Sequence, residues 1–312
     1  MERRGDSALQ CRRSATDSHR RPMLHNLSSQ PVVFLFWLLH FLPLPVLAAC
    51  GNGLGRLFFL LGRRRRQVVR INLELCFPEL SAAEREALAR DHFRVLGRSL
   101  LERGVLWWGS RRRLERMIRI EGTEKLRAQL DAGRPVILLA PHFVGLDAGG
   151  VAVAMRFDSL SMYAEQANQV FDRLLLNGRR RFGDQLLLTR QDGIRATVKA
   201  MKSGRPFYYL PDLNARRREA VFVPFFGVPA ATTAGLSRLA RAAGAAVLTC
   251  VTRVLPGGQG YVTEIGDAWD DFPTADAEAD TARMNAWIEA AVRTMPEQYY
   301  WVHRRFKTRP EG

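Results

Sequence analysis

The pattern of apolar and polar positions divides the chain into two unlike parts. Residues 32–50 are the most apolar stretch, residues 57–61 add a second apolar piece, and residues 63–66 are four consecutive arginines. At about 1.5 Å per residue, a helix over residues 32–50 is about 28 Å long, close to the thickness of a hydrocarbon core. The pattern therefore predicts a membrane anchor over residues 31–62.

Beyond the arginines, short apolar runs alternate with segments of helical periodicity. The runs predict buried strands at residues 135–140, 160–164, 185–189, 206–210, 246–254 and 261–265. Helices are predicted at residues 148–155, 171–182, 194–202, 233–243 and 280–295, and a longer helix follows the capping-box residues Ser81 and Glu84 toward Trp108. Such alternation predicts an α/β fold with a mostly parallel central sheet flanked by helices.

The apolar stretch leaves two arrangements open. Pro43 and Pro45 would kink a helix, so the segment forms either one kinked span or a helix lying in the membrane interface. The following arginines favour a cytoplasmic location for the rest of the chain. A third interpretation takes residues 47–50, which end in Cys50, as a lipoprotein cleavage site, and the same arginines oppose that export.

Composition narrows the class of protein. The 312 residues carry 47 Lys and Arg against 31 Asp and Glu, a net charge of +16, and 47% are hydrophobic, which excludes a mainly disordered chain. The excess of positive charge leaves nucleic acid, anionic lipid and an acidic protein open as partners. Residues 1–30 are polar and arginine-rich, which predicts a disordered tail, and Met1 and Met23 are alternative starts.

The four cysteines are far apart in the sequence. Cys11, Cys50, Cys76 and Cys250 form no Cys-x-x-Cys pair, so neither a disulfide framework nor a zinc site is expected. We expect no metal and no cofactor.

Candidate chemistry lies where the predicted strand 135–140 ends. His142 follows that strand and Asp147 comes five residues later. The two side chains can meet if residues 142–146 form a loop, and His142 would then act as a general base with Asp147 as its partner. In the alternative interpretation, His142 caps the start of a helix and Asp147 is exposed.

Arginine runs recur at residues 111–113, 179–181 and 216–218, with Arg304 and Arg305 near the end. Each run alone is typical of a solvated surface, and together they could bind phosphate or carboxylate groups through their planar guanidinium forks. The aromatic block at residues 222–227 predicts either a core strand or the wall of an acyl-chain channel.

Four blocks carry a resemblance to a known family. They are Asn-Leu-Glu-Leu-Cys-Phe-Pro-Glu at residues 72–79, the His142 to Asp147 motif, Leu-Pro-Asp ending at Asp212 with residues 222–227, and residues 296–310. In this order they resemble the late acyltransferases of lipid A biosynthesis, the lauroyl and myristoyl transferase family of Gram-negative bacteria. The chain departs from the family in carrying Asp147 where Glu is common.

The resemblance implies a glycerolipid-acyltransferase-like fold and an inner-membrane enzyme whose catalytic domain, residues 63–312, faces the cytoplasm. It implies transfer of a fatty acyl group from acyl carrier protein, which is acidic, to a hydroxyl of a phosphorylated lipid A precursor. His142 matches the general base and Asp147 its partner. The expected substrate-binding residues are Arg179, Arg181, Asp212, Arg217, Arg304 and Arg305.

Two other functions stay open at this point. An acyltransferase for another membrane lipid, such as a lysophospholipid or an aminolipid, would use the same His and Asp chemistry. A membrane-tethered nucleic-acid-binding protein fits the charge, although no helix-turn-helix or RNA-binding motif occurs. Acyl chain length, acyl position and oligomeric state are not encoded in these motifs.

Overall fold

The computed structural model describes residues 29–189 and 191–310. The predicted tail, apart from its last two residues, lies outside the described residues, as do Met1, Met23 and Cys11. Ser29 begins a short apolar helix, Ser29–Leu39. The long helix α2 follows, from Leu44 to Leu61.

Within the described residues, seven strands form one sheet in the order β1-β9-β8-β2-β5-β3-β4. All neighbours are parallel except β8 and β9, which pair antiparallel. The strands are β1 (Ile118–Glu121), β2 (Val136–Leu139), β3 (Leu160–Met162), β4 (Leu186–Leu188), β5 (Phe207–Tyr209), β8 (Ala246–Val254) and β9 (Tyr261–Ala268). The predicted α/β class and the six predicted strands are confirmed. β1 was not predicted because polar residues fill half of its four positions.

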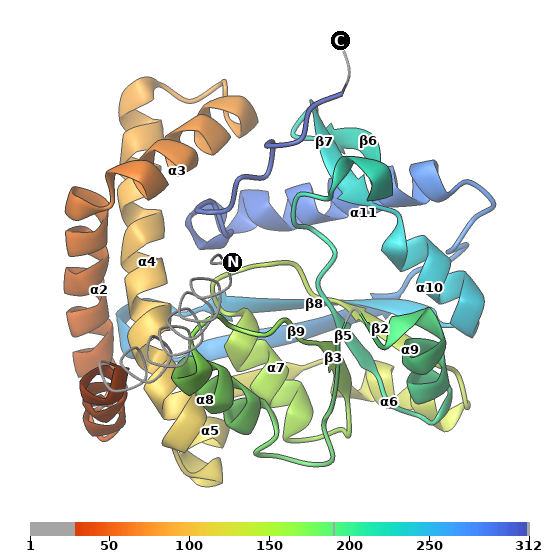
Figure 1. Ribbon diagram of the computed structural model, residues 1–312, viewed down its shortest axis with the longest axis horizontal. Coiled ribbons are helices and arrows are strands. Elements are labelled where there is room, and N and C mark those ends of the chain that lie inside the picture. The colour runs from red at the N-terminus through yellow and green to blue at the C-terminus, as the bar shows by residue number, and fades with distance from the viewer. Residues whose placement is uncertain (1–28, 190, 311–312) are drawn as a thin grey trace, which may run out of the picture.

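Helices cover both faces of this sheet, with α11 on one side and α7 on the other (Figure 1). The remaining long helices are α3 (Arg63–Cys76), α4 (Ala82–Trp108), α5 (Arg111–Met117), α6 (Thr123–Asp131), α7 (Leu146–Ala154), α8 (Gln169–Arg179), α9 (Gly193–Lys202), α10 (Gly235–Ala243) and α11 (Ala277–Thr294). The capping box is confirmed, because the Ser81 hydroxyl accepts from the Glu84 amide and the Glu84 carboxylate accepts from the Ser81 amide.

The aromatic block at residues 222–227 forms the end of β6 (Ala220–Phe225) and the turn into β7 (Val228–Thr233), with which β6 pairs as a hairpin. The side chains of Val223, Phe225 and Phe226 are buried, and Phe225 and Phe226 belong to the main hydrophobic core. These residues therefore form a core strand and its turn, which is the first of the two interpretations of this block.

The predicted anchor is two helices rather than one span over residues 32–50. The chain turns at residues 40–43, because a proline at position 43 ends one helix and begins the next. Among the described residues, Leu44–Leu61 is the helix long and apolar enough to cross a membrane.

α2 packs against α4 through glycines. A Cβ atom at Gly97 of α4 would lie 2.5 Å from the Gly51 carbonyl oxygen and 2.5 Å from the Gly55 amide nitrogen. The absence of side chains at these positions lets the two backbones touch. The glycines of α2 are thus packing residues, and α2 is docked on the rest of the protein along one face.

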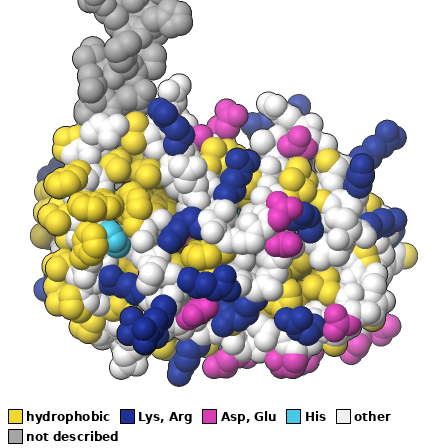
Figure 2. Space-filling view, turned by 90° about the horizontal axis from the view of Figure 1, so that it is seen from below, with side chains coloured by type: hydrophobic (Ala, Val, Ile, Leu, Met, Phe, Trp, Pro, Cys, Tyr) yellow, Lys and Arg dark blue, Asp and Glu magenta, His cyan; other side chains and the backbone are white. Residues whose placement is uncertain are grey.

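The other face of this helical layer is apolar. Figure 2 shows hydrophobic side chains gathered over the end of the molecule formed by α2 and helix Ser29–Leu39. The large exposed apolar residues there are Val32, Phe34, Leu35, Trp37, Leu38, Phe41, Val46, Leu57, Leu60 and Leu61. A surface of this extent and composition is typical of contact with a membrane.

The glycine contact gives a first prediction. Gly97→Ala should lower the free energy of unfolding by about 1–3 kcal/mol, since the added methyl group pushes α2 away from α4. The control is Gly53→Ala, also in α2, where a Cβ atom meets nothing within 4 Å. Thermal unfolding in neutral detergent checks both. Equal midpoints for the two variants would contradict the close packing.

His92 gives a second prediction. Its ring is fully buried in α4, its Nδ1 bonds to the Glu297 carbonyl oxygen at 3.0 Å, and desolvation lowers its pKa from 6.5 to about 4. Between pH 4 and pH 6.5, His92 therefore binds a proton in the unfolded chain but not in the folded chain. Stability is present above pH 6.5 and is lost as pH falls toward 4, by about 3 kcal/mol for a shift of this size.

His92→Gln keeps a donor for the carbonyl and does not titrate in this range. Its unfolding midpoint should fall less steeply between pH 6.5 and pH 4 than that of the unchanged protein. Parallel curves for the two proteins would show that His92 does not contribute this proton uptake.

Candidate active site

His142 lies in the loop that joins β2 to α7. The chain leaves the buried strand β2, and Gly145 and Leu146 begin the helix, so residues 142–145 form the loop that the sequence predicts. The C-terminal segment holds this loop in place. The Val144 amide donates to the Gln298 carbonyl at 2.8 Å, and the Tyr300 amide donates to the His142 carbonyl at 3.0 Å.

Asp212 is the carboxylate bonded to His142. The His142 Nδ1 lies 2.7 Å from Asp212 Oδ1, and the His142 backbone amide donates to Asp212 Oδ2 at 2.9 Å. Tyr299 donates its hydroxyl to the same Oδ2 at 2.9 Å. The Asp212 side chain is 1% exposed and that of His142 is 16% exposed, so the pair sits at the edge of the core with the imidazole toward the surface.

The sheet explains why these two residues meet. β2 and β5 are neighbouring parallel strands, and His142 and Asp212 each follow their strand by three residues. The carboxyl ends of parallel strands meet at one edge of a sheet, where ligands collect in open α/β folds. The sequence predicted both strands, so their common edge was the available signal for this pair.

The charge on Asp212 is stabilised despite its burial. Burial alone would raise the pKa of this carboxyl group, but the nearby His142 ring and the hydrogen bonds from His142 and Tyr299 lower it below its ordinary value. An ionised Asp212 accepts the Nδ1 proton of His142. The Nε2 atom of the ring is then left without a proton and can accept one.

Asp147 does not pair with the imidazole, which corrects the expectation from spacing. Asp147 lies in the first turn of α7, and its Oδ2 is 2.9 Å from Arg103 of α4 while its Oδ1 is 3.9 Å from Arg179 of α8. Burial opposes ionisation, but the charges of Arg103 and Arg179 lower the pKa of Asp147. The two arginines draw this carboxylate toward the helices and away from the His142 ring.

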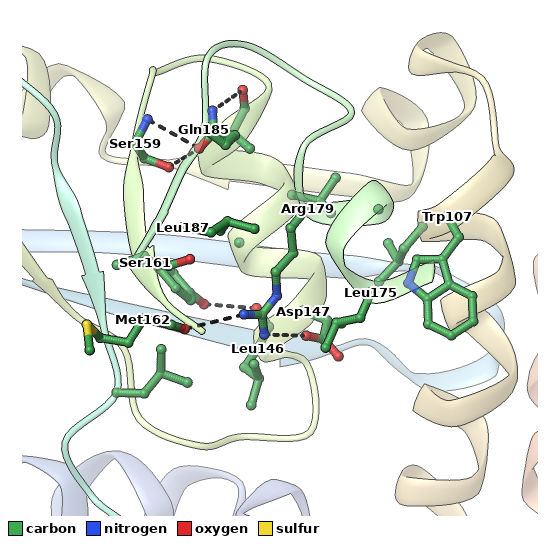
Figure 3. A pocket seen from close by; sticks show the side chains of 17 residues that line it. Trp107, Leu146, Asp147, Ser159, Ser161, Met162, Leu175, Arg179, Gln185 and Leu187 are labelled. Atoms are coloured by element: carbon green, nitrogen blue, oxygen red, sulfur yellow. Dashed lines mark hydrogen bonds and ion pairs between the residues drawn. The ribbon is translucent and has the colours of Figure 1, made fainter. Parts of the chain in front are cut away.

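Asp147 and Arg179 line a narrow, mostly apolar pocket beside the loop (Figure 3). Figure 3 shows the Arg179 guanidinium between the Asp147 carboxylate and the Met162 carbonyl, which lies 3.4 Å from Arg179 Nη1. Apolar lining is contributed by Leu106, Trp107, Leu146, Val151, Ala154, Met162, Leu175, Leu187 and Leu210. Arg179 therefore lines a pocket, which is compatible with the substrate-binding role expected from the sequence, and that role stays a prediction.

Two other arginines have structural partners, which corrects their expected substrate roles. Arg181 donates to the carbonyl oxygens of Leu106 at 2.5 Å and Gly109 at 2.6 Å, so it satisfies the end of α4. Arg305 is 2% exposed and donates to the Ala231 carbonyl at 2.9 Å and to the Thr232 hydroxyl at 2.7 Å. Their guanidinium groups stabilise the fold.

Arg217 and Arg304 lie at the surface. Arg217 donates to the Arg309 carbonyl at 2.7 Å, which ties it to the C-terminal segment. Arg304 is exposed beside α3. The neighbouring His303 was not predicted as a site residue. Desolvation chiefly, and the charge of His142 next, lower the pKa of His303 to about 4, and its Nε2 accepts a hydrogen bond from the Asn214 amide at 3.1 Å.

Comparison with known proteins identifies the family. The model of the bacterial lipid A biosynthesis acyltransferases matches residues 19–308. The chain belongs to this family. It is 38% identical over 279 residues to the lipid A biosynthesis lauroyltransferase of Escherichia coli, covering 89% of this chain and 90% of that protein. Identity to the Escherichia coli palmitoleoyltransferase is 35%, with the same coverage, and to the myristoyltransferase it is 32%, covering 86% and 82%.

The resemblance given by the four sequence blocks is therefore confirmed. The protein is an acyltransferase of lipid A biosynthesis, with an acyl donor and a glycolipid acceptor. Family membership also leaves the nucleic-acid-binding alternative without support.

The structural role of Arg181 is open to a direct test. Arg181→Met should lower the free energy of unfolding by about 1.5–3 kcal/mol, because two carbonyls at the end of α4 lose a charged donor. The KM values for both substrates should stay within about twofold. Arg180→Met, at the exposed neighbouring position, is the control and should change neither quantity. A raised KM at unchanged stability would restore the substrate-binding role.

Proposed function

We propose that this protein transfers a fatty acyl chain from acyl carrier protein to a hydroxyl of a lipid A precursor, with His142 as the general base. The observation that carries the proposal is the His142–Asp212 pair at the carboxyl edge of the sheet, in a chain of the lipid A acyltransferase family. In this proposal Asp212, expected to bind substrate, takes instead the orienting role that both the spacing and the resemblance had given to Asp147.

The proposed chemistry needs one base and no covalent enzyme intermediate. His142 Nε2 accepts the proton of the acceptor hydroxyl, and the hydroxyl oxygen attacks the carbonyl carbon of the thioester. The tetrahedral adduct then collapses, the carbon–sulfur bond breaks, and the protonated imidazole returns its proton to the thiolate. Asp212 holds the ring in the required tautomer and stabilises the imidazolium while it exists.

The apolar pocket lined by Asp147 and Arg179 is a suitable binding site for the acyl chain of the donor. Its lining includes Leu146, four residues after His142, and Asp147 in the first turn of α7. A hydrocarbon chain in this pocket would be shielded from water, which favours binding in proportion to the apolar area covered. Arg179, paired with Asp147 in the lining, is placed to meet the polar end of such a chain.

The charge balance supports acyl carrier protein as the donor. The chain has a net charge of +16, and electrostatic attraction to an acidic carrier protein would speed encounter between them. The arginine-rich surface also suits an anionic glycolipid acceptor. Both partners therefore fit the same excess of positive charge.

The apolar layer supports a location on the inner membrane. α2 is docked on α4 along one face, and an exposed arginine, Arg56, interrupts its other face. These features favour a helix pair that lies in the membrane interface over a free spanning helix. The arginines at the start of α3 favour the cytoplasmic side. Cys50 lies inside α2 rather than in an extended cleavage segment, which favours this anchor over a lipoprotein.

The assignment is tested with purified protein, acyl-carrier-protein thioester and lipid A precursor, with products measured by mass spectrometry. His142→Ala should lose about 10²–10⁴-fold in kcat, the usual contribution of such a base. Asp212→Asn should lower kcat by a similar factor with little change in KM, because the amide cannot stabilise the imidazolium. Asp147→Asn should lower kcat by a smaller factor.

Unfolding midpoints of all three variants serve as the control for folding. More than a tenth of the activity remaining in His142→Ala would contradict the base assignment. A larger loss of kcat in Asp147→Asn than in Asp212→Asn would restore Asp147 as the partner. If only another lysolipid were acylated, the acceptor part of the proposal would be wrong.

A further inference from the structure

The C-terminal segment runs beside α3 after it leaves the active site (Figure 1). Arg65 of α3 donates to the Val302 carbonyl at 3.1 Å. Asn72, about two turns further along α3, donates to the carbonyls of Trp301 and His303 at 2.7 Å each. Buried hydrogen bonds of this kind fix the two segments at a constant spacing.

Two adjoining hollows lie between these segments. Their volumes are about 440 Å³ and about 370 Å³, and they share Arg64, Val68 and Arg304 in their lining. The cationic side chains around them are Arg64, Arg65, Arg304, Lys307 and Arg309. Neither lining contains an Asp or a Glu, so the charge of the hollows is not neutralised from within.

The hollows also have an apolar side. Val68, Ile71 and Phe306 contribute to the lining, and the Ile71 side chain is exposed. The last two residues of α2, Leu60 and Leu61, are 65% and 73% exposed and come just before the arginines of α3. The site therefore joins a cluster of guanidinium groups to a surface suited to hydrocarbon chains.

The hollows adjoin the catalytic pair through His303. Arg304, which lines both hollows, is the next residue in the chain after His303. The Asn214 amide, two residues after Asp212, donates to His303 Nε2 at 3.1 Å, and the Asn214 side chain binds Thr308. Ligands at His142 and in the hollows would thus be held by the same short stretch of chain.

We propose that the two adjoining hollows together bind a phosphate ester of a lipid headgroup, and that this phosphate belongs to the acceptor of the reaction. The inference rests on the proposed function and adds the site that holds the acceptor while its hydroxyl reaches His142. Planar guanidinium forks match the oxygens of a phosphate. A concave site with an apolar side suits a phosphorylated lipid better than the convex surface of an acidic protein.

The first arm of the test measures binding without turnover. In His142→Ala protein in neutral detergent, phosphorylated lipid A precursor should bind about tenfold or more weakly after Arg64→Gln and Arg304→Gln are added together. Lys307→Gln alone should weaken binding by a smaller factor. Rising salt should weaken binding to the parent protein and have less effect on the double variant, because the interaction is electrostatic.

The matched control is Arg112→Gln with Arg116→Gln on α5, which removes the same charge from exposed positions at the opposite end of the molecule from α3 (Figure 1). Binding should be unchanged in this control. Equal weakening in control and test variants would show only a dependence on net charge and would overturn the proposal.

The second arm uses active protein and compares the phosphorylated acceptor with one whose phosphates have been removed. The double variant should raise KM about tenfold or more for the phosphorylated acceptor only, with KM for the carrier-protein donor unchanged. A raised donor KM would assign the hollow to the carrier protein. The assay is repeated in vesicles with and without phosphatidylglycerol. A rise in KM that is equal for both acceptors and occurs only in vesicles containing phosphatidylglycerol would assign the hollows to bulk anionic lipid. Either result overturns the proposal.

The two arms separate this inference from the proposed function. Absence of acyl transfer by the unchanged protein would remove the function, while the binding arm would still report on the hollow. Normal transfer with unchanged acceptor binding would leave the function and remove the phosphate site.

Discussion

The Asp212 carboxylate is the interaction on which the active site depends. It accepts hydrogen bonds from the His142 amide, the His142 ring and the Tyr299 hydroxyl, which come from two segments far apart in the sequence. A buried carboxylate is unfavourable unless such partners surround it. Because these three donors compensate for its burial, the loop after β2, the loop after β5 and the C-terminal segment are held in one arrangement. The imidazole is oriented as a consequence of that balance.

The charged side chains near the His142–Asp212 pair lie in two different environments. Asp147 is held by Arg103 and Arg179 at the apolar pocket, while the exposed arginines of α3 and the C-terminal segment line the two hollows. A hydrocarbon chain and a phosphorylated headgroup need such different surroundings. In the proposed reaction, the hydroxyl and the thioester would meet at His142, with the hydrocarbon chain in the apolar pocket and the headgroup in the two hollows.

The sequence predicted six of the seven strands of the sheet, most helices and the place of His142 after a strand, because these follow from local periodicity and from position at a strand end. It failed on the partner of His142, since the order of strands in the sheet is a long-range property. Proximity in sequence favoured Asp147, but β2 lies beside β5 and so brings Asp212 closer. Similarly, no local signal separates Arg181 and Arg305, which satisfy backbone carbonyls, from Arg179 and Arg304, which face a pocket and the surface.

The glycine contact between α2 and α4 connects the exposed apolar surface of α2 to the candidate active site. Because α2 docks on α4 without intervening side chains, the apolar face of α2 has a fixed position relative to Arg103, which α4 carries to Asp147. α3 follows α2 after a single residue and carries Arg64 and Arg65, which line the two hollows. A lipid headgroup at the membrane surface would therefore meet those arginines and His142 without leaving the interface. For a substrate that carries several acyl chains, this removes the cost of exposing them to water.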